Sequence, residues 1–187
     1  DGMVLLTGHL PYGAREVLPF LPPLVSVCEE IADTGMPFVG IDNRQAAKSA
    51  VAHLIELGHR HIAHIGGPAG NILSSARQEG YQEALAQAGL PFDEELVLPG
   101  DFSIEGGRLA VERLFLRDTL PTAFFCGNDE MAIGVLTALS QRGYKVPDDF
   151  SVVGFDDIQF ASCTVPPLTT VRQPRRLIGE EAMTMML

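Results

Sequence analysis

The sequence predicts an α/β protein built on doubly wound parallel sheets. Strand-like and helix-like segments alternate four times between residues 45 and 155, three of the helical segments end at a glycine, and 46% of the 187 residues are hydrophobic. Strands that alternate with amphipathic helices are typical of parallel βαβ units, and this hydrophobic content is enough to build a core. Disorder is therefore not expected.

The alternation begins with a helix. Apolar residues at helical spacing predict an amphipathic helix over residues 45–57, with Asn43 as its cap. The short apolar stretch 61–65 is closed by Gly-Gly-Pro, which predicts a buried strand. Ser75 and Gln78 then resemble a capping box, so the next helix is expected to begin at Ser75.

The same alternation continues along the chain. Periodicity predicts strands at residues 96–98, 123–126 and 151–155, with helices at 104–116 and 130–141 between them. Each of these strands is followed by a loop that carries polar or aromatic residues. Parallel strands place such loops at one edge of a sheet, so this edge is where a ligand is expected.

The two ends of the chain predict a second, smaller lobe. Apolar segments indicate strands at 3–7, 24–28 and 38–41, and an amphipathic helix occupies 178–187. These are few elements for a lobe, and Asp1 leads directly into a strand, so we expect the N-terminal lobe to be incomplete. The expected domains are an N-terminal lobe at 1–42, a C-terminal lobe at 43–172 and a return segment at 173–187.

Composition excludes several classes of protein. The formal net charge of -11 has the wrong sign for a surface that neutralises phosphates, so this chain alone is expected to bind DNA poorly. The basic cluster Arg172, Arg175 and Arg176 is too small to change that. No apolar stretch is long enough for a membrane span, and no segment resembles a signal peptide, which favours a cytoplasmic protein.

Neither a metal site nor a cofactor site is expected. The three cysteines occur singly without CxxC spacing. His59 and His61 flank the start of a strand, whereas His64 alternates to the other face, so the three histidines do not converge. The segment 66–70 is neither a dinucleotide-binding loop nor a Walker loop, and no GxSxG sequence occurs, so no catalytic residue is assigned and the protein is not expected to be an enzyme.

Four residues at the predicted sheet edge are candidates for ligand binding. Arg77, Phe102, Asn128 and Asp156 follow four successive strands. Guanidinium and carboxylate groups can hold hydroxyls or ring nitrogens, and an aromatic face can stack on a flat ring. Each residue also has a simpler interpretation: Arg77 a solvated surface residue, Phe102 core, Asn128 a helix cap, and Asp156 a cap or turn.

The sequence motifs at these positions resemble the effector-binding core of the lac repressor family of bacterial transcription regulators. The resemblance covers essentially the whole chain, and its motifs occur in the family's order. The main ones are Leu57-Gly58-His59-Arg60-His61-Ile62-Ala63, Asn128-Asp129-x-Met131-Ala132-x-Gly134, Ser151-Val152-Val153-Gly154-Phe155-Asp156-Asp157 and Pro166-Pro167-Leu168-Thr169-Thr170.

This resemblance implies a two-lobed, periplasmic-binding-protein-like fold that binds its effector in the cleft between the lobes. Arg77, Phe102, Asn128 and Asp156 would line the cleft, and Gln173 would lie at the return crossing. The chain departs from the family pattern in the first lobe, where the place of a ligand-facing Asp or Asn falls on Cys28, next to Glu29.

The resemblance also implies partners. Two such bodies pair in this family, which would place Ile133 and Cys163 near a homodimer contact, although core packing would explain these residues equally well. The effector is expected to be a nucleoside such as cytidine, ahead of a sugar, and it would change the operator affinity of a helix-turn-helix head that this chain lacks. A periplasmic sugar-binding protein of a transporter is the alternative.

Overall fold

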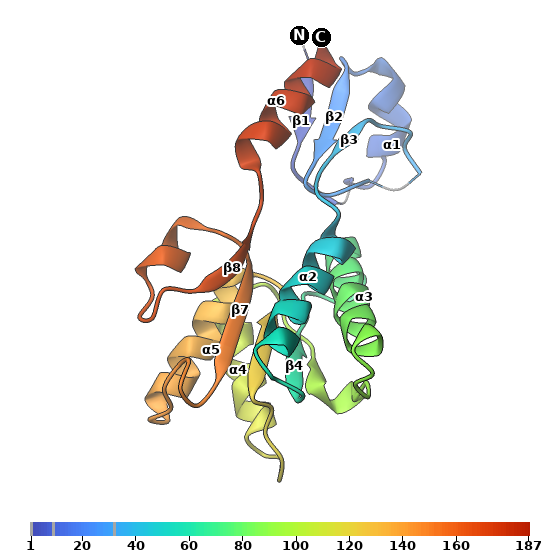
Figure 1. Cartoon of the computed structure of the whole chain (residues 1–187). Helices are drawn as coiled ribbons and strands as arrows, with labels where there is room; N and C mark the ends of the chain where they lie inside the picture. Colours follow the sequence, from blue (N-terminus) through green and yellow to red (C-terminus); the bar gives the residue numbers. More distant parts are fainter. Residues whose placement is uncertain (1, 9, 32) are drawn as a thin grey trace. The chain divides into compact units, whose positions relative to one another are not determined.

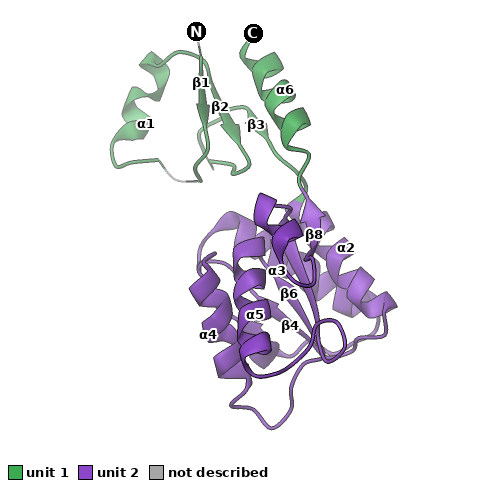
Figure 2. Cartoon of the chain, turned by 90° about the vertical axis from the view of Figure 1, so that its left-hand side faces the viewer, with its two compact units in different colours: residues 1–42, 173–187 green, residues 43–172 purple. Residues whose placement is uncertain are grey.

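The computed structural model describes residues 2–8, 10–31 and 33–187. The chain forms two compact units, which Figure 2 shows in different colours. Unit 1 comprises Asp1–Asp42 and Gln173–Leu187, and unit 2 comprises Asn43–Arg172. The chain thus leaves unit 1 between Asp42 and Asn43 and returns to it between Arg172 and Gln173.

Unit 2 is a five-stranded parallel sheet with helices on both faces, which confirms the predicted α/β class with parallel strands (Figure 1). In sheet order its strands are β5 (Val97–Leu98), β4 (Ile62–Ile65), β6 (Ala123–Cys126), β7 (Ser151–Asp156) and β8 (Thr169–Arg172). Its helices are α2 (Asn43–Glu56), α3 (Ile72–Gln87), α4 (Ile104–Leu114) and α5 (Asp129–Gln141). Two 3₁₀ turns complete it, η2 (Glu94–Leu96) and η3 (Gln159–Cys163).

Helices α2 and α3 pack together, as do α4 and α5 (Figure 1). The α4–α5 pair is close because two glycines lie where the helices cross. A Cβ atom at Gly107 would lie 2.0 Å from the Met131 carbonyl oxygen, and one at Gly134 would lie 2.0 Å from the Ile104 carbonyl oxygen. Close packing at this point brings the first turns of both helices together at the carboxyl edge of the sheet.

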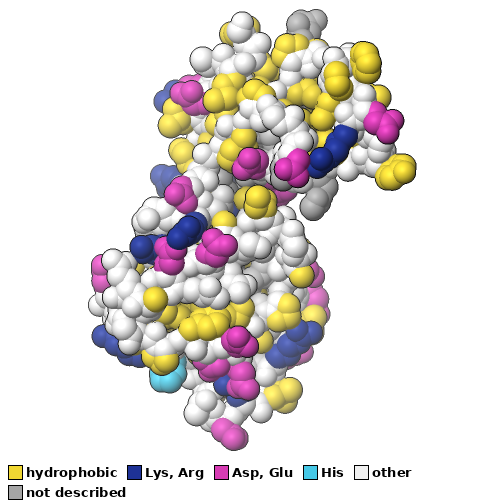
Figure 3. Space-filling model, turned by 90° about the vertical axis from the view of Figure 1, so that its right-hand side faces the viewer, with side chains coloured by type: hydrophobic (Ala, Val, Ile, Leu, Met, Phe, Trp, Pro, Cys, Tyr) yellow, Lys and Arg dark blue, Asp and Glu magenta, His cyan; other side chains and the backbone are white. Residues whose placement is uncertain are grey.

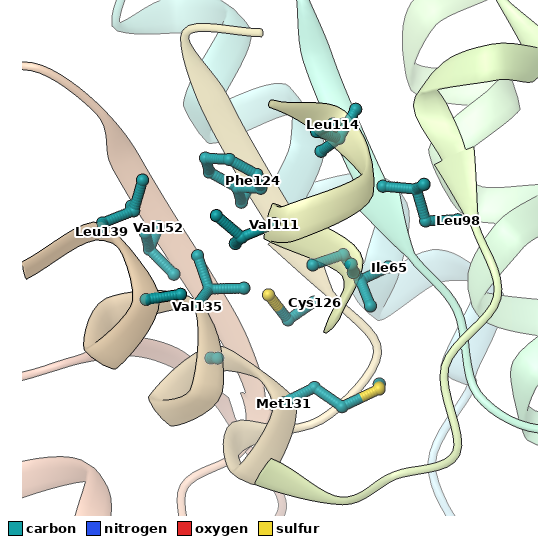
Figure 4. Packing of buried hydrophobic residues seen from close by; sticks show 14 of the residues in the cluster. Ile65, Leu98, Val111, Leu114, Phe124, Cys126, Met131, Val135, Leu139 and Val152 are labelled. Carbon is teal, nitrogen blue, oxygen red and sulfur yellow. The ribbon is translucent and has the colours of Figure 1, made fainter. Parts of the chain in front are cut away.

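The main core lies between the sheet and the α4–α5 pair. Side chains on a strand alternate between the two faces, so Ile65, Phe124, Cys126 and Val152 all point to this side. They meet apolar residues of both helices, including Val135, as Figure 4 shows. This layer anchors the strands whose ends carry the candidate site.

Unit 1 is a three-stranded parallel sheet with one long helix against it. Its elements are β1 (Met3–Leu5), α1 (Ala14–Val17), η1 (Leu18–Phe20), β2 (Leu24–Val27), β3 (Phe38–Val39) and α6 (Arg175–Met186). Val25, Val39, Ile178 and Ala182 form its small core. Many other apolar side chains of this unit are exposed, among them Leu6 at 74%, and Figure 3 shows hydrophobic atoms spread over the surface of unit 1.

The structure corrects the predicted start of α3. The helix begins at Ile72, and its cap is Asn71, whose side chain accepts hydrogen bonds from the Leu73 and Ser74 amides at 2.9 and 3.0 Å. Ser75 lies inside the first turn, where its hydroxyl donates to the Asn71 carbonyl oxygen. The predicted capping box was wrong because asparagine is at least as good a cap as serine and stands one turn earlier.

Two strands also differ from the prediction. Of the predicted strand 96–98, only Val97–Leu98 is extended, since residue 96 ends a 3₁₀ turn. Strand β8 was not predicted at all. It is an edge strand whose residues are exposed or half-buried, so its sequence lacks the apolar run of the central strands. Among the residues that the structure describes, no helix is long and apolar enough to cross a membrane.

Candidate functional site

The four candidate residues of unit 2 lie in one connected group at the carboxyl edge of its sheet. Arg77 forms an ion pair with Asp156 and also contacts the residue before Asn128, and Asn128 in turn contacts Phe102. The order of the strands explains this, because β4, β6 and β7 are neighbours and their loops emerge side by side. The four residues therefore converge, as the sequence predicts, because the strands that they follow are neighbours in the sheet.

Arg77 is the centre of the group and is only 3% exposed, so it is not a solvated surface residue. Its Nε donates to Asn43 Oδ1 at 3.0 Å, and another guanidinium nitrogen donates to the Gly127 carbonyl oxygen. The guanidinium carbon lies 3.8 Å from the centre of the Phe155 ring. Arg77 therefore joins α2, α3, β6 and β7, and we infer that it supports the fold of this edge as well as any ligand.

Asp156 is the most accessible charged partner of Arg77. Its Oδ1 lies 3.5 Å from a terminal nitrogen of Arg77, and 29% of its side chain is exposed. The residue ends β7, and its backbone φ is 110°. Aspartate tolerates a positive φ better than most residues, but the conformation is still strained. Asp156 is the last residue of a strand and does not cap a helix, since the N-cap of the 3₁₀ turn η3 that follows is Ile158.

Asn128 is held by two hydrogen bonds. Its Oδ1 accepts from the Met131 amide at 2.9 Å and so caps α5, which is the simpler interpretation that the sequence left open. Its Nδ2 donates to the Phe102 carbonyl oxygen, also at 2.9 Å. The amide therefore links the loop after β6 to the loop after β5, and any ligand contact by Asn128 would be added to this bridging role.

Phe102 lies over a glycine in the loop after β4. A Cβ atom at Gly67 would lie 2.2 Å from Phe102 Cζ, so only glycine permits the ring to lie there. The ring is half-buried, packing in part against the core, and the backbone φ of Phe102 is 64°. Core packing and ligand stacking are thus both compatible with its position. A half-buried ring at this edge offers a flat apolar surface to a ligand.

A second acidic residue at this edge is fully buried. Asp129, the first residue of α5, is 0% exposed. Its carboxylate accepts hydrogen bonds from the Ile158 amide at 2.8 Å and from the Thr170 hydroxyl. Burial raises the pKa of Asp129 above its ordinary value, and these two hydrogen bonds act in the opposite direction.

Behind this edge lies a buried histidine. His64 is 0% exposed, and its ring stacks on Tyr81 at 5.3 Å and on Phe125 at 5.0 Å. Its Nδ1 donates to the Phe125 carbonyl oxygen at 3.1 Å, and its Nε2 has no hydrogen-bond partner. Burial lowers the pKa of His64 to about 4, so the ring is neutral at pH 7.

No metal site is formed by the part of the chain that the structure describes, since no three His, Cys, Asp or Glu side chains gather there. His59 lies at the opposite end of the sheet, where its Nδ1 and Nε2 each lie 2.9 Å from the hydroxyl oxygens of Thr122 and Ser151, respectively. His61 is exposed at the start of β4. The histidines therefore have separate structural environments.

Two predicted positions belong to unit 1. Cys28 directly follows β2, where it is half-buried, with φ at 68°, and its amide donates to the Val39 carbonyl oxygen at 2.9 Å. Gln173 is the first residue of the return segment, and its carbonyl oxygen accepts from the Arg175 amide at 2.8 Å. Cys28 thus follows a strand that the sequence predicts, whereas Gln173 follows β8, which was not predicted, and lies at the return crossing.

The two predicted dimer residues share an apolar groove on unit 2. Ile133 of α5 and Cys163 of η3 line a groove of about 450 Å³, together with Ile104, Ile158 and Phe160. Phe160 is 67% exposed and Cys163 is also exposed, whereas Ile133 is half-buried. Core packing therefore does not account for Cys163, and the groove is an exposed apolar surface of the kind that marks interaction sites.

Comparison with known proteins identifies the family of this chain. Residues 51–187 match the family of the periplasmic binding protein-like domain. The chain is 43% identical over 188 residues to the HTH-type transcriptional repressor CytR of Escherichia coli K12, an alignment that covers all of this chain and 55% of that protein. The chain spans about half the length of this curated relative.

Solved structures agree with this match. A sugar-binding transcriptional regulator of the LacI family from Escherichia coli, in complex with phosphate, superimposes with a TM-score of 0.88 at 32% identity over 99% of this chain and 67% of that one. The transcription regulator CcpA of Lactococcus lactis gives a TM-score of 0.89 at 35% identity over 100% and 68%. These matches confirm the resemblance and the periplasmic-binding-protein-like fold that it implies.

Sequence reasoning missed three residues that shape the site. Asn43 was assigned only as a helix cap, yet its side chain accepts from Arg77. Phe155 was assigned only to a strand, yet its ring supports the Arg77 guanidinium. Asp129 was noted only beside Asn128. The sequence carried no signal for Asp129, because an acidic residue in the first turn of a helix usually faces solvent.

Proposed function

Since this chain belongs to the LacI family of transcriptional regulators and carries that family's periplasmic binding protein-like domain, we propose that it is the effector-binding and dimerisation core of a bacterial transcriptional repressor. A transport protein is not favoured, because the relatives are regulators. These relatives are not enzymes, and we assign no catalytic role to the chain.

The effector binds at the carboxyl edge of the unit 2 sheet. The observation that carries this proposal is the ion pair between Arg77 and the half-exposed Asp156, with Asn128 and Phe102 beside it. A carboxylate fixed in orientation by a guanidinium can accept hydrogen bonds from two hydroxyls of one ligand. The resemblance to the family supports the same four residues, and it adds Gln173 as a further contact.

A neutral ligand with hydroxyl groups and a flat ring fits this chemistry best. The Asp156 carboxylate is already paired with Arg77, so a cation would be repelled by Arg77 and an anion would be repelled by Asp156. A nucleoside such as cytidine offers sugar hydroxyls to Asp156 and a ring to Phe102. A sugar is the second candidate, supported by the related Escherichia coli structure described as a sugar-binding regulator.

Regulation follows from a shift between conformations of the protein. An effector changes an equilibrium only by the difference between its affinities for the two states. The DNA-binding head lies outside this chain, whose net charge of -11 is unsuited to phosphate contacts. Operator DNA is therefore bound through that head, in the cytoplasm.

The apolar groove around Ile133 and Cys163 is the proposed homodimer contact. In sedimentation experiments on the full-length protein, we expect Ile133→Glu to shift the protein from dimer to monomer, because a buried charge opposes association. Gln87→Glu, which adds the same charge to the exposed end of α3 and not to the groove, is the matched control and is expected to stay dimeric. An unchanged dimer in both variants would remove this assignment.

Isothermal titration calorimetry of the full-length protein tests the effector. Ribonucleosides and common sugars are titrated separately, and binding of cytidine or another ribonucleoside is the expected result. Heat from a sugar alone would exclude the nucleoside but keep the site. If no ligand bound, or if the ligand bound Asp156→Asn as tightly as the wild type, the assignment of this edge would be wrong.

A further inference from the structure

We propose that Asp129 is a positioning residue for the effector site, because it holds the strained turn Asp156–Ile158 in the shape that presents the Asp156 carboxylate beside Arg77. This inference rests on the proposed function, since it concerns how that site is oriented. It adds a residue to which the family resemblance assigns no role.

The Asp129 carboxylate does not serve its own helix. An acidic residue in the first turn of a helix usually faces solvent or caps the turn. In this chain Asn128 is the cap of α5, and Asp129 is 0% exposed. Its Oδ2 accepts from the Ile158 amide at 2.8 Å, and its Oδ1 accepts from the Thr170 hydroxyl. One oxygen is therefore bound to the segment that follows β7, and the other is bound to strand β8.

Two consecutive strained residues lie where β7 ends and that segment begins. The backbone φ is 110° at Asp156 and 53° at Asp157, and neither residue is glycine. Such conformations persist only where surrounding contacts hold them. Thr170 extends the hold, because its hydroxyl oxygen accepts from the Asp157 amide at 3.3 Å while it donates to Asp129. Asp129 thus fastens Ile158 directly and Asp157 through Thr170.

The strand beneath the turn is shaped to admit the carboxylate. A Cβ atom at Gly154 would lie 2.3 Å from Asp129 Oδ1, so any larger residue there would displace the carboxylate. Position 154 of β7 therefore requires glycine, because the Asp129 carboxylate approaches the strand closely there.

Arg77 and Asp156, the two charged residues of the proposed effector site, are held in place by different elements of unit 2. Arg77 is fixed from α2 and β6, through Asn43 and the Gly127 carbonyl oxygen. Asp156 ends β7, where it pairs with Arg172 of β8, and Asp129 is the buried group that holds the turn after it. Loss of Asp129 would leave Arg77 in place and free the turn, so the separation of the two charges would no longer be defined.

The test uses three variants of the full-length protein. Asp129→Asn keeps the size of the side chain, an oxygen for the Ile158 amide and a polar group for Thr170. Asp129→Ala removes all of these. Leu139→Ala, a fully buried apolar change on the same helix, is the control for loss of stability alone. Amide hydrogen exchange at Ile158 is measured without ligand, and affinity is measured by calorimetry with cytidine.

We expect Ile158 to exchange about 30-fold faster or more in Asp129→Ala, and cytidine to bind about tenfold more weakly, because the turn opens locally. Asp129→Asn should restore both values to within about threefold of the wild type, and Leu139→Ala should leave the cytidine affinity within the same range. Should Asp129→Ala fail to fold, Thr170→Val removes only the hydroxyl and should accelerate exchange of the Asp157 amide.

Two results would overturn the proposal. One is that the Ile158 amide exchanges as slowly in Asp129→Ala as in the wild type. If Asp129→Ala does not fold, the corresponding result is unchanged exchange of the Asp157 amide in Thr170→Val. The other is equal loss of cytidine affinity in Asp129→Ala and Leu139→Ala. If the wild type does not bind cytidine, the nucleoside part of the proposed function fails, and exchange at Ile158 decides the role of Asp129 by itself.

Discussion

The carboxyl edge of the unit 2 sheet and the apolar layer between that sheet and α4–α5 are built on the same strands but with opposite kinds of residue. The layer contains fully buried side chains such as Phe124 and Cys126, which need no partner beyond close packing (Figure 4). The edge contains the buried charges of Arg77 and Asp129, and each of them is held by specific hydrogen bonds. The edge therefore orients polar groups, whereas the layer supplies most of the stability.

Backbone strain shows the same difference. Among the described residues of unit 2, the non-glycine residues with positive φ are Phe102, Asp156 and Asp157, and all three lie at the carboxyl edge. Strain of this kind costs about 1–3 kcal/mol per residue and persists where packing elsewhere offsets it. The apolar layer thus permits the edge to keep conformations that suit a ligand. Variants that separate stability from affinity can test this division.

The largest expected effect is in the layer. Phe124→Ala should lower the free energy of unfolding by about 3–5 kcal/mol, because it removes a fully buried ring and leaves a cavity. Urea denaturation measures this loss. Cytidine affinity, measured under conditions where the variant is folded, should be unchanged. A parallel loss of affinity would show that the layer and the edge are not separable.

The next effect concerns pH. The pKa of His64 is about 4 in the folded protein and about 6.5 when exposed, so the unfolded chain binds one more proton between these values. Folding stability contributed by the neutral ring is present above pH 6.5 and is lost as the pH falls toward 4. The full loss is about 3 kcal/mol, since each pKa unit corresponds to about 1.4 kcal/mol.

His64→Phe keeps an aromatic ring between Tyr81 and Phe125 but cannot take up a proton. Denaturation at pH 7, 5.5 and 4.5 should therefore show a smaller fall in stability for this variant than for the wild type. Asp129 acts in the opposite sense, because its raised pKa favours folding as the pH falls, so only the difference between variant and wild type isolates His64. Equal falls in stability in both proteins would contradict the buried, neutral state.

The smallest expected effect distinguishes the residue that caps α3 from a residue inside the first turn of that helix. Asn71→Ala should lower the free energy of unfolding by about 1 kcal/mol, because it removes the cap of α3. Ser75→Ala should change it by less than half of that, since Ser75 lies beyond the cap. Neither variant should alter cytidine affinity. A larger loss for Ser75 in thermal denaturation would restore the capping box that the sequence predicts.

The sequence was sufficient to predict the central strands and the meeting of Arg77, Phe102, Asn128 and Asp156. Apolar runs such as that of β6 can be recognised locally, and in a parallel sheet the loops after them must emerge at one edge. The side chains that fill this edge are therefore predictable as a group, although the strand order is not visible in the sequence.

Features that depend on distant partners could not be predicted. Strand β8 is extended because it pairs with β7, and nothing in the segment Thr169–Arg172 indicates that pairing. The burial of Arg77 depends in the same way on Asn43, Gly127 and Phe155, which are separate in sequence. The unsatisfied nitrogen of His64 is visible only once Tyr81 and Phe125 enclose the ring.

The most direct test of the central claim is the affinity of Asp156→Asn for cytidine, measured by calorimetry beside its unfolding free energy. Asparagine has nearly the same size and tolerates positive φ, so the variant removes the charge with little change in the backbone. The proposed role of this edge predicts at least a tenfold loss of affinity, about 1.4 kcal/mol, with stability within about 1 kcal/mol of the wild type. Unchanged affinity would contradict it.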